Sequence, residues 1–336
     1  KQNNLLDDSI ILSLSGGVDS MVILSILISI RNIWKDLKIY TVSVNYNLRK
    51  ESYLESEFIK EYCNHHKVHS MIVEVNDSIE ENGNRKFKNK KRSDFEESSL
   101  NLRFDAYKNL IEKFNCKGVL LGHHKDDITE NIFTNIMKGH SILDLEVMKK
   151  NGTRKGVRIF RPLLNFHKLD IYKFAEKNKI PYFLDTTPTW SRRGKMRNEI
   201  FPMFSSIFGK NWNHKLNEIG EQSNNWRNTI EINIIEPWIK EVYFFEHGFI
   251  IPIKYTEDEN LWVYFVPKLF FKINCSTIKR KSILLLFSCL KNSVKKKKVL
   301  DSGYAFIIKE NHVVIFNEKK FKYDESKFSL ENLKLI

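Results

Sequence analysis

The stretch 10-IILSLSGGVDSMVIL-24 contains the strongest structural signal in the sequence. The apolar run over residues 9–15 predicts a buried strand, and apolar residues at helical spacing over 19–34 predict a helix. The bend between them holds five small or polar residues: Ser15, Gly16, Gly17, Asp19 and Ser20. Two glycines let the backbone approach a ligand closely, and the free N–H groups that begin a helix favour phosphate. The stretch therefore predicts a phosphate-binding bend.

Asp19 is unusual in such a bend, because a carboxylate beside phosphate is repulsive unless a cation lies between them. A magnesium ion that bridges Asp19 and the phosphate oxygens would remove this repulsion. The alternative is that Asp19 only caps the helix and the bend is a plain turn. No lysine follows the glycines, so this is not the Gly-x-x-x-x-Gly-Lys-Ser/Thr loop of the common nucleotide hydrolases.

The first half of the chain alternates between predicted strands and predicted helices. Further strands are predicted at 38–46, 69–75, 117–122 and 157–161, and further helices at 51–66, 97–114, 125–138 and 167–179. This alternation is typical of an α/β fold, a doubly wound parallel sheet with helices on both faces. Ligands bind at the carboxyl ends of such strands. We therefore expect the polar segments after the strands to meet at one edge: 15–20, 45–49, 122–127 and 161–163.

Changes in composition predict three parts in this chain of 336 residues, a length that exceeds one ordinary core. The first part is 1–203, with a polar, basic segment at 77–95 that predicts a mobile loop. A helical linker region follows at 204–245. Residues 246–336 predict a small mixed α+β domain with one helix, at 277–291, and a hairpin at 304–318.

The formal net charge of +14 favours a polyanionic partner, nucleic acid first. The lysine-rich composition of proteins from AT-rich genomes would explain the charge equally well. The four cysteines form no Cys-x-x-Cys pair, which excludes a zinc ribbon, an iron–sulfur motif and a disulfide ladder. No apolar run is long enough to span a membrane. We expect the cytoplasm, or the plastid or mitochondrial matrix if a transit segment has been removed ahead of Lys1.

The sequence Ser-Gly-Gly-x-Asp-Ser after a first strand resembles the PP-loop of the ATP pyrophosphatases. The resemblance implies that an oxygen of the substrate is adenylated by ATP, that pyrophosphate leaves, and that a nucleophile then displaces AMP. It also implies that Ser15, Gly16, Gly17 and Ser20 hold pyrophosphate and that Asp19 holds Mg²⁺.

Four further segments resemble the tRNA(Ile)-lysidine synthetases, so that the resemblance covers about residues 9–203. The segment 44-VNYNLRKES-52 is similar to V-D-H-G-L-R-x-x-S, 96-EESSLNLRFDAYKNL-110 to E-x-x-A-R-x-x-R-Y, and 122-GHHKDDITEN-131 to G-H-H-x-D-D-Q-A-E-T. The pair 159-IFRPLL-164 and 181-PYFLDTTPTWSRRGKMRNEIFP-202 is similar to R-P-L-L, P-x-x-x-D-x-S-N and R-N-x-x-R-x-x-x-x-P. The chain departs from these patterns at Tyr46, Leu100, Asn131 and Gly194.

The third segment supplies candidate acids, together with Gly122 and His123 as candidate ATP contacts. Asp126 and Glu130 lie one helical turn apart on one face, as do Asp127 and Asn131. Acids placed in this way can hold magnesium, with Asp127 as a second candidate ligand, or orient a cationic amine. Two alternatives are a zinc site that also uses the histidines, and simple pairing of the acids with the helix dipole.

Basic residues supply the candidate contacts to phosphate. Arg103 and Arg161 would offset the charge that develops on the leaving group. Arg193 and Arg197 are four residues apart and would clamp an RNA phosphate, unless they belong to a plain basic surface helix. The other candidate tRNA contacts are Arg49, which a solvated arginine would explain equally well, and the run that contains Lys295 and Lys296.

The resemblance implies an enzyme that uses ATP, Mg²⁺ and L-lysine to modify the wobble cytidine of an isoleucine tRNA with a CAU anticodon. It leaves open whether the chain forms a homodimer. Three rivals remain: a tRNA thiolase on the same fold, an amide synthetase fed by ammonia, and a non-catalytic tRNA-binding relative. Unpaired cysteines disfavour the first, the lack of a glutaminase motif disfavours the second, and the intact SGGVDS stretch disfavours the third.

Overall fold

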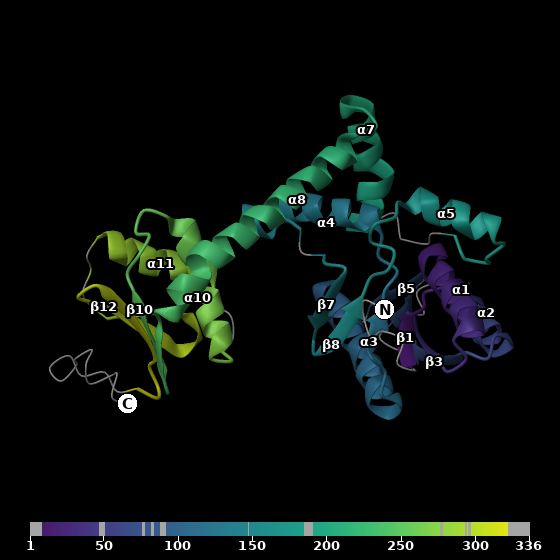
Figure 1. Cartoon of the computed structure of the whole chain (residues 1–336), viewed down its shortest axis with the longest axis horizontal. Coiled ribbons are helices and arrows are strands. Elements are labelled where there is room, and N and C mark those ends of the chain that lie inside the picture. The colour runs from purple at the N-terminus through teal and green to yellow at the C-terminus, as the bar shows by residue number, and fades with distance from the viewer. Residues whose placement is uncertain are drawn as a thin grey trace. The chain divides into compact units, whose positions relative to one another are not determined.

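The structure is a computed structural model in which the described residues are 9–46, 51–75, 78–81, 84–87, 92–146, 148–184, 191–275, 278–292, 294 and 297–321 (Figure 1). The chain forms two compact units. One comprises residues 1–140 and 145–221, and the other comprises residues 141–144 and 222–336. In the described part of the chain, no helix has the length and apolar character needed to cross a membrane.

The first unit contains a six-stranded sheet in the order β3-β2-β1-β6-β8-β7. The strands are β1 (Ser9–Ser13), β2 (Lys38–Asn45), β3 (His69–Glu74), β6 (Val119–Leu120), β7 (Asn151–Arg154) and β8 (Val157–Phe160). All neighbouring pairs are parallel except β7 with β8, which is antiparallel. The predicted parallel sheet is confirmed, with one antiparallel edge strand added. Because β1 lies between β2 and β6, the order of the strands reverses at its carboxyl end, where ligands bind in such sheets.

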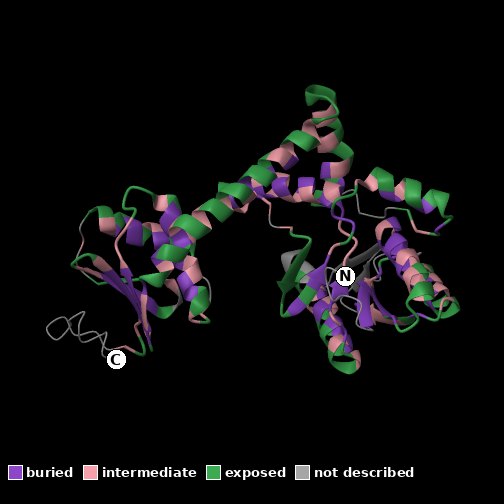
Figure 2. Cartoon of the chain, viewed as in Figure 1, coloured by how far each residue is buried: buried purple, intermediate pink, exposed green. Residues whose placement is uncertain are grey.

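Helices cover both faces of this sheet: α1 (Val18–Ile33), α2 (Glu51–His65) and α5 (Lys168–Lys177) lie on one face and α3 (Arg92–Phe114) on the other, while α4 (Lys125–Met137) follows β6. Successive side chains of a strand point to opposite faces. Ile10 and Leu12 accordingly pack in a core with α1, α2 and α5, whereas Ile11 packs in a second core with α3. The central strands β1 and β2 are buried from both sides, whereas the edge strand β7 is exposed (Figure 2). This double burial explains why β1 reads as a continuous apolar run.

The expectation of a mobile loop at 77–95 is wrong for residues 78–81, 84–87 and 92–95, which form regular secondary structure. A hairpin forms from β4 (Ser78–Glu81) and β5 (Asn84–Phe87), and α3 already begins at Arg92. The segment lacks the apolar alternation that marks a strand. Backbone pairing does not require that alternation, so polarity alone was a poor guide here.

The chain continues through three helical segments of the first unit: α6 (Arg192–Lys195), a π-helical turn (Met196–Ile200) and α7 (Phe201–Phe208). The long helix α8 (Trp212–Ile230) follows, and in sequence it contains the division between the units at residues 221 and 222. The second unit then has a π-helical turn (Glu231–Ile235) and α9 (Glu236–Lys240). The three-part division predicted from the sequence stays a prediction.

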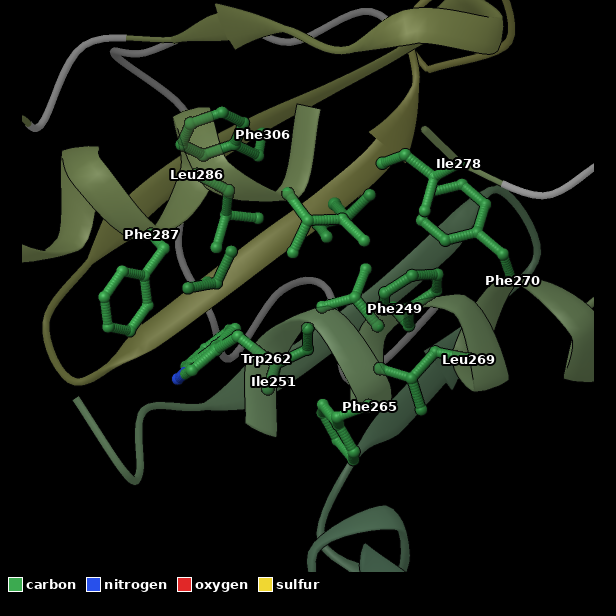
Figure 3. Close-up of a cluster of buried hydrophobic side chains, with 14 of the residues drawn as sticks. Phe249, Ile251, Trp262, Phe265, Leu269, Phe270, Ile278, Leu286, Phe287 and Phe306 are labelled. Carbon is green, nitrogen blue, oxygen red and sulfur yellow. The ribbon is translucent and has the colours of Figure 1, made fainter. Parts of the chain in front are cut away.

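The second unit packs two helices, α10 (Glu259–Lys272) and α11 (Arg280–Lys291), with an antiparallel sheet. The sheet order is β11-β12-β13-β10-β9, formed by β9 (Tyr243–Phe245), β10 (Gly248–Pro252), β11 (Lys298–Val299), β12 (Tyr304–Lys309) and β13 (His312–Asn317). The predicted hairpin is present as β12 and β13. Figure 3 shows the aromatic core of this unit, which includes Phe249, Trp262 and Phe270.

The expectation of a single helix in residues 246–336 is wrong, because α10 precedes α11 there. Pro267 lies inside α10 and removes a backbone donor, which normally argues against a helix. Asp258 caps the helix by accepting hydrogen bonds from the N–H groups of Asn260 and Leu261. Burial of six apolar side chains of α10 outweighs the cost of the proline.

Candidate active site

The bend after β1 is held by its own serines. The Ser15 N–H donates to Ser20 Oγ at 3.2 Å, and Ser20 Oγ donates to the carbonyl of Gly17 at 3.0 Å. Gly16 has φ of +78°, and a Cβ there would lie 2.6 Å from Cδ2 of Phe183. The bend therefore requires glycine at this position for both conformation and space. Gly17 precedes α1 in an extended conformation and presents the start of that helix to the pocket described below.

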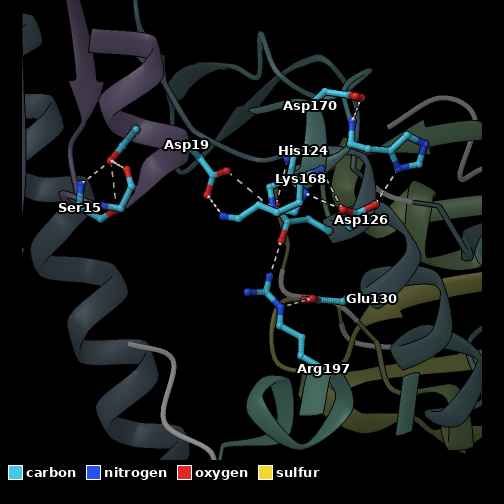
Figure 4. Close-up of polar contacts among 12 residues, drawn as sticks. Ser15, Asp19, His124, Asp126, Glu130, Lys168, Asp170 and Arg197 are labelled. Atoms are coloured by element: carbon cyan, nitrogen blue, oxygen red, sulfur yellow. Dashed lines mark hydrogen bonds and ion pairs between the residues drawn. The ribbon is translucent and has the colours of Figure 1, made fainter. Parts of the chain in front are cut away.

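Asp19 lies in the first turn of α1 and points toward α5 (Figure 4). Its Oδ2 accepts a hydrogen bond from Nζ of Lys168 at 2.7 Å, whereas its Oδ1 is buried and has no hydrogen-bond partner. A Cβ at Gly122 would lie 3.0 Å from the Cβ of Asp19, so the end of β6 approaches α1 closely at this point. The sequence did not identify Lys168, which lies 149 residues from Asp19 in the chain.

His123 and Arg161 form a second contact at this edge of the sheet. Arg161 Nε donates to Nδ1 of His123 at 3.1 Å, and its Nη1 donates to the carbonyl of Lys149 at 2.7 Å. Burial, followed by the charges of Arg161 and Arg193, lowers the pKa of His123 to about 4, even though Asp127 acts in the opposite direction. His123 is therefore neutral at pH 7, and among the described residues the acceptors of Arg161 are neutral.

Asp127 and Glu130 form a buried ion-pair network with two arginines. Both carboxylates are only 4% exposed. Arg193 donates to Glu130 at 2.5 Å and to Asp127 at 2.8 Å, and Arg197 contacts the same two acids, at 3.2 Å from Asp127. Burial alone would raise the pKa of Asp127, but His124, Arg193 and the His124 backbone N–H hold it below its ordinary value. This network joins α4 to the segment 192–200.

Asp126 points to the start of α5. Its Oδ2 accepts from the backbone N–H of Lys168 at 3.0 Å, and its Oδ1 lies 2.9 Å from Nδ1 of His167 (Figure 4). A second backbone bond, from Lys125 N–H to the carbonyl of Phe166 at 2.9 Å, supports the same junction. Asp126 therefore fixes the first turn of α5 against the first turn of α4.

Arg103 of α3 reaches the carboxyl end of β2, where its guanidinium donates to the hydroxyl of Tyr46. Tyr107, one turn further along α3, donates to Ser13 Oγ at 2.7 Å. Tyr46 stands where the family pattern has histidine, so this departure retains a polar partner for Arg103. The departure at Leu100 is different, because Leu100 packs against the apolar core beneath α3.

Many of these side chains line a pocket of about 400 Å³ at the carboxyl edge of the sheet, whereas Gly16 and Arg161 line neither this pocket nor the next one described. Its lining includes most of the predicted residues: Ser15, Gly17, Asp19, Ser20, Arg103, Gly122, His123, Asp127, Arg193 and Arg197. A neighbouring pocket of about 300 Å³ is lined by Asp126 and Glu130 together with Tyr172, Phe201 and Trp212. Lys168 lines both pockets. Arg49, Lys295 and Lys296 lie outside the described residues, and their roles stay predictions.

The predicted magnesium ligands differ in how well they fit a metal ion. Asp19 fits, because its buried Oδ1 has no hydrogen-bond partner. Asp127 fits less well in this arrangement, since its Oδ1 accepts from both arginines and its Oδ2 accepts from the His124 N–H at 3.0 Å. The described residues contain no cluster of three or more His, Cys, Asp or Glu with metal-binding geometry.

Comparison with known proteins supports the motif analysis. Three of the similar curated proteins are tRNA(Ile)-lysidine synthases. The one from Chlamydia muridarum is 29% identical over 247 residues, which is 72% of each chain. The one from Thermosipho africanus is 29% identical over 62% of this chain and 47% of its own length, and the one from Chlamydia trachomatis serovar D is 27% identical over 77% and 75%.

Among solved structures, a U34-tRNA thiolase from Methanococcus maripaludis matches with a TM-score of 0.49 and 15% identity, over 70% of this chain and 76% of its own. Similarity at this level says nothing about the reaction. The match to a family model is more extensive. The model described as the PP-loop domain covers residues 1–204, which include the bend, the parallel sheet and every side chain of the pocket. The chain therefore belongs to the PP-loop domain family.

Proposed function

We propose that this protein is an ATP-dependent ligase that joins lysine to the wobble cytidine of a tRNA with a CAU anticodon. The observation that carries the proposal is the bend Ser15–Ser20 beside the buried Oδ1 of Asp19, which accepts no hydrogen bond from the described residues, at the reversal point of a PP-loop sheet. The names of three curated relatives, each a tRNA(Ile)-lysidine synthase, support an isoleucine tRNA as the substrate, and the motif resemblance adds the wobble cytidine and the CAU anticodon.

In the first half-reaction, O2 of the cytidine attacks the α-phosphorus of ATP, and the bond from that phosphorus to pyrophosphate breaks. The N–H groups at the start of α1 and the hydroxyls of Ser15 and Ser20 would hold the leaving pyrophosphate. Arg103 and Arg161 donate to neutral partners in the described structure, so their charges are available to offset the developing negative charge. Neutral His123 lines the pocket beside Gly122 and would contact the nucleotide.

Asp19 would hold Mg²⁺ through Oδ1, and the ion would neutralise phosphate oxygens and the departing pyrophosphate. Asp127 would keep its bonds to the two arginines. These bonds hold three residues of the pocket lining, Asp127, Arg193 and Arg197, against one another.

In the second half-reaction, the ε-nitrogen of lysine attacks C2 of the adenylated base, the C2–N bond forms, and the C2–O bond to AMP breaks. The smaller pocket suits this amine, because Asp126 and Glu130 are acidic and Tyr172, Phe201 and Trp212 would cover its alkyl chain. One of these carboxylates would accept the proton that the amine loses. The base must leave the anticodon stack to reach both pockets.

The tRNA would be held by basic residues, as the formal charge of +14 suggests. Arg49, Lys295 and Lys296 are candidates for phosphate contacts. Arg193 and Arg197 are further candidates, although a phosphate would have to compete with their bonds to Asp127 and Glu130. Binding that depends on such contacts should weaken steeply with salt.

The test is pyrophosphate release from ATP, measured with and without CAU-anticodon tRNA and followed by incorporation of labelled lysine into the RNA. We expect release to require tRNA and to fall at least about 100-fold in Asp19→Ala, because the phosphate site loses its carboxylate. Asp36→Ala removes an exposed carboxylate from the loop before β2 and is the matched control.

Three outcomes separate the candidates. Lysine in the RNA, with release dependent on Asp19, supports the proposal. Release without lysine incorporation would retain adenylation and point to another nucleophile, with sulfur as the first alternative, although no cysteine is among the described residues that line either pocket. Tight tRNA binding with no release of pyrophosphate would refute the enzyme and leave a tRNA-binding protein.

A further inference from the structure

The bend after β1 contains no lysine, yet a lysine ammonium lies at its edge. Nζ of Lys168 contacts Oδ2 of Asp19 at 2.7 Å, and the two side chains are 22% and 21% exposed. The ring of Tyr172, one turn along α5, lies beneath the same ammonium, 5.3 Å from Nζ to the ring centroid. A half-buried ion pair that rests on an aromatic face is more rigid than a pair between two solvated side chains.

The backbone of Lys168 is fixed independently of its side chain. Asp126 accepts from the Lys168 N–H with one oxygen and contacts His167 with the other. Asp170 accepts from the His167 N–H at 3.2 Å and closes the first turn of α5. The side chain then spans from this turn to the first turn of α1, as Figure 4 shows. Both ends of Lys168 are therefore held at the mouth of the phosphate bend.

The charges around the bend indicate what this ammonium does. Arg193 and Arg197 are balanced by Asp127 and Glu130. Asp19 balances Lys168 through one oxygen only, and among the described residues the ammonium has no other hydrogen-bond acceptor. An ammonium carries three N–H groups, so two remain for a ligand in the pocket that Lys168 lines.

We infer that Lys168 is the polyphosphate-binding cation of this site and that Asp126 is its positioning residue. Lys168 contributes from another helix the ammonium that other nucleotide loops carry within their own sequence. It binds the pyrophosphate portion of a nucleoside triphosphate while its contact with Asp19 keeps it at the bend. The inference rests on the proposed function only for the identity of that ligand.

The experiment measures binding of inorganic pyrophosphate and of ATP to the full chain by calorimetry, in magnesium and in EDTA. Lys168→Met keeps the length of the side chain and removes its charge, and we expect it to weaken pyrophosphate binding at least tenfold in both buffers. Lys168→Arg should retain binding within about fivefold, because the charge remains. Lys173→Met removes an exposed charge from the same helix and should change the affinity less than twofold.

Asp126→Asn tests the positioning role. We expect it to weaken pyrophosphate binding in the wild-type background and to have no further effect in the Lys168→Met background, because it acts through Lys168. A purely structural role would give the same loss in both backgrounds. If Lys168→Met fails to fold, Lys168→Arg and Asp126→Asn still report on the site.

Equal affinities for Lys168→Met and Lys173→Met would overturn the inference while leaving the ligase proposal intact. Loss of pyrophosphate binding in Lys168→Met, in a chain that never releases pyrophosphate with tRNA, would uphold the inference and refute the ligase proposal. If Lys168 only neutralised Asp19, the double variant Asp19→Asn/Lys168→Met would recover pyrophosphate binding in EDTA. A double variant that stays weak supports a direct phosphate contact.

Discussion

His123 makes the stability of the first unit depend on pH, and the direction of the dependence follows from its surroundings. Its Nδ1 accepts from Arg161 at 3.1 Å, so that nitrogen carries no proton in the folded state. Burial and the nearby arginines lower its pKa from 6.5 to about 4. The unfolded chain would bind a proton at His123 between these two values, whereas the folded chain would not. His123 therefore does not lower the free energy of unfolding above pH 6.5, and it lowers that free energy as the pH falls from 6.5 toward 4.

The size of the effect follows from the two pKa values. At pH 7.5 His123 is neutral in both the folded and the unfolded state, so its protonation does not change the free energy of unfolding. At pH 5.0 the unfolded state is almost fully protonated and the folded state is not, which destabilises the folded state by about 2 kcal/mol. A shift of this size is a large part of the stability of an ordinary domain.

The assay is urea denaturation of the wild type and of His123→Asn at pH 7.5 and 5.0. Asparagine places its side-chain oxygen where Nδ1 lies, so it keeps an acceptor for Arg161 but does not titrate. We expect the wild type to lose about 2 kcal/mol more than His123→Asn between the two pH values. His140→Asn, at an exposed position, is the control and should behave as the wild type. Equal losses in the wild type and His123→Asn would show that His123 titrates in the folded chain and would refute the reasoning.

Three further substitutions test separate parts of the structure. Gly16→Ala places a Cβ 2.6 Å from the Phe183 ring at a positive φ, and should cost about 1–3 kcal/mol in urea denaturation and weaken ATP binding in calorimetry. Glu130→Gln leaves Arg193 one carboxylate short and should cost about 3 kcal/mol, while an unchanged melting temperature would contradict a structural role for this pair. Trp238→Ala removes a ring stacked at 3.7 Å on Phe265 and should cost about 3–5 kcal/mol, measured on the unfolding transition of the second unit.

Local sequence was a good guide wherever one short segment determines the structure. The apolar run before Ser15 predicted β1, and the glycines predicted the bend, because both depend on neighbours in the chain. The hairpin at 304–318 followed from two apolar segments around a short turn. In α10 the local signal was misleading, since Pro267 argues against a helix and only burial in the folded unit compensates for it.

Pairings between distant segments could not be predicted in the same way. Motif positions identified Asp19, Asp126 and Arg103 but not their partners. Lys168 and Tyr46 are ordinary residues in sequence, and only the packing of α5 and the end of β2 against the site gives them a role. The same limit applies to Arg193 and Arg197: their spacing predicts a clamp for an RNA phosphate and gives no sign of the two buried acids that the fold places beside them.

The charges in the pocket, with Arg161 behind His123, fall into two groups: residues that hold the site together and residues whose charge is available to a substrate. Asp127, Glu130 and their two arginines neutralise one another, and disrupting such a buried network costs more than its net contribution to stability. Arg103 and Arg161 instead donate to neutral oxygen or nitrogen atoms, so their positive charges are not cancelled by these partners.

Charges fixed in this way do not have to be rearranged when a polyanion enters the pocket. Such preorganised charges are what electrostatic stabilisation of a departing pyrophosphate requires. The acids that the motif presents as reactants therefore divide by location. Asp19 faces the phosphate bend, Asp126 anchors α5, and Asp127 pairs with two arginines. Among the motif acids, Glu130 alone combines an arginine pair with a place in the smaller aromatic pocket. Activity should thus tolerate Asp126→Asn better than Asp19→Asn, since of these two acids Asp19 is the one that lines the pocket where the proposed reaction develops charge.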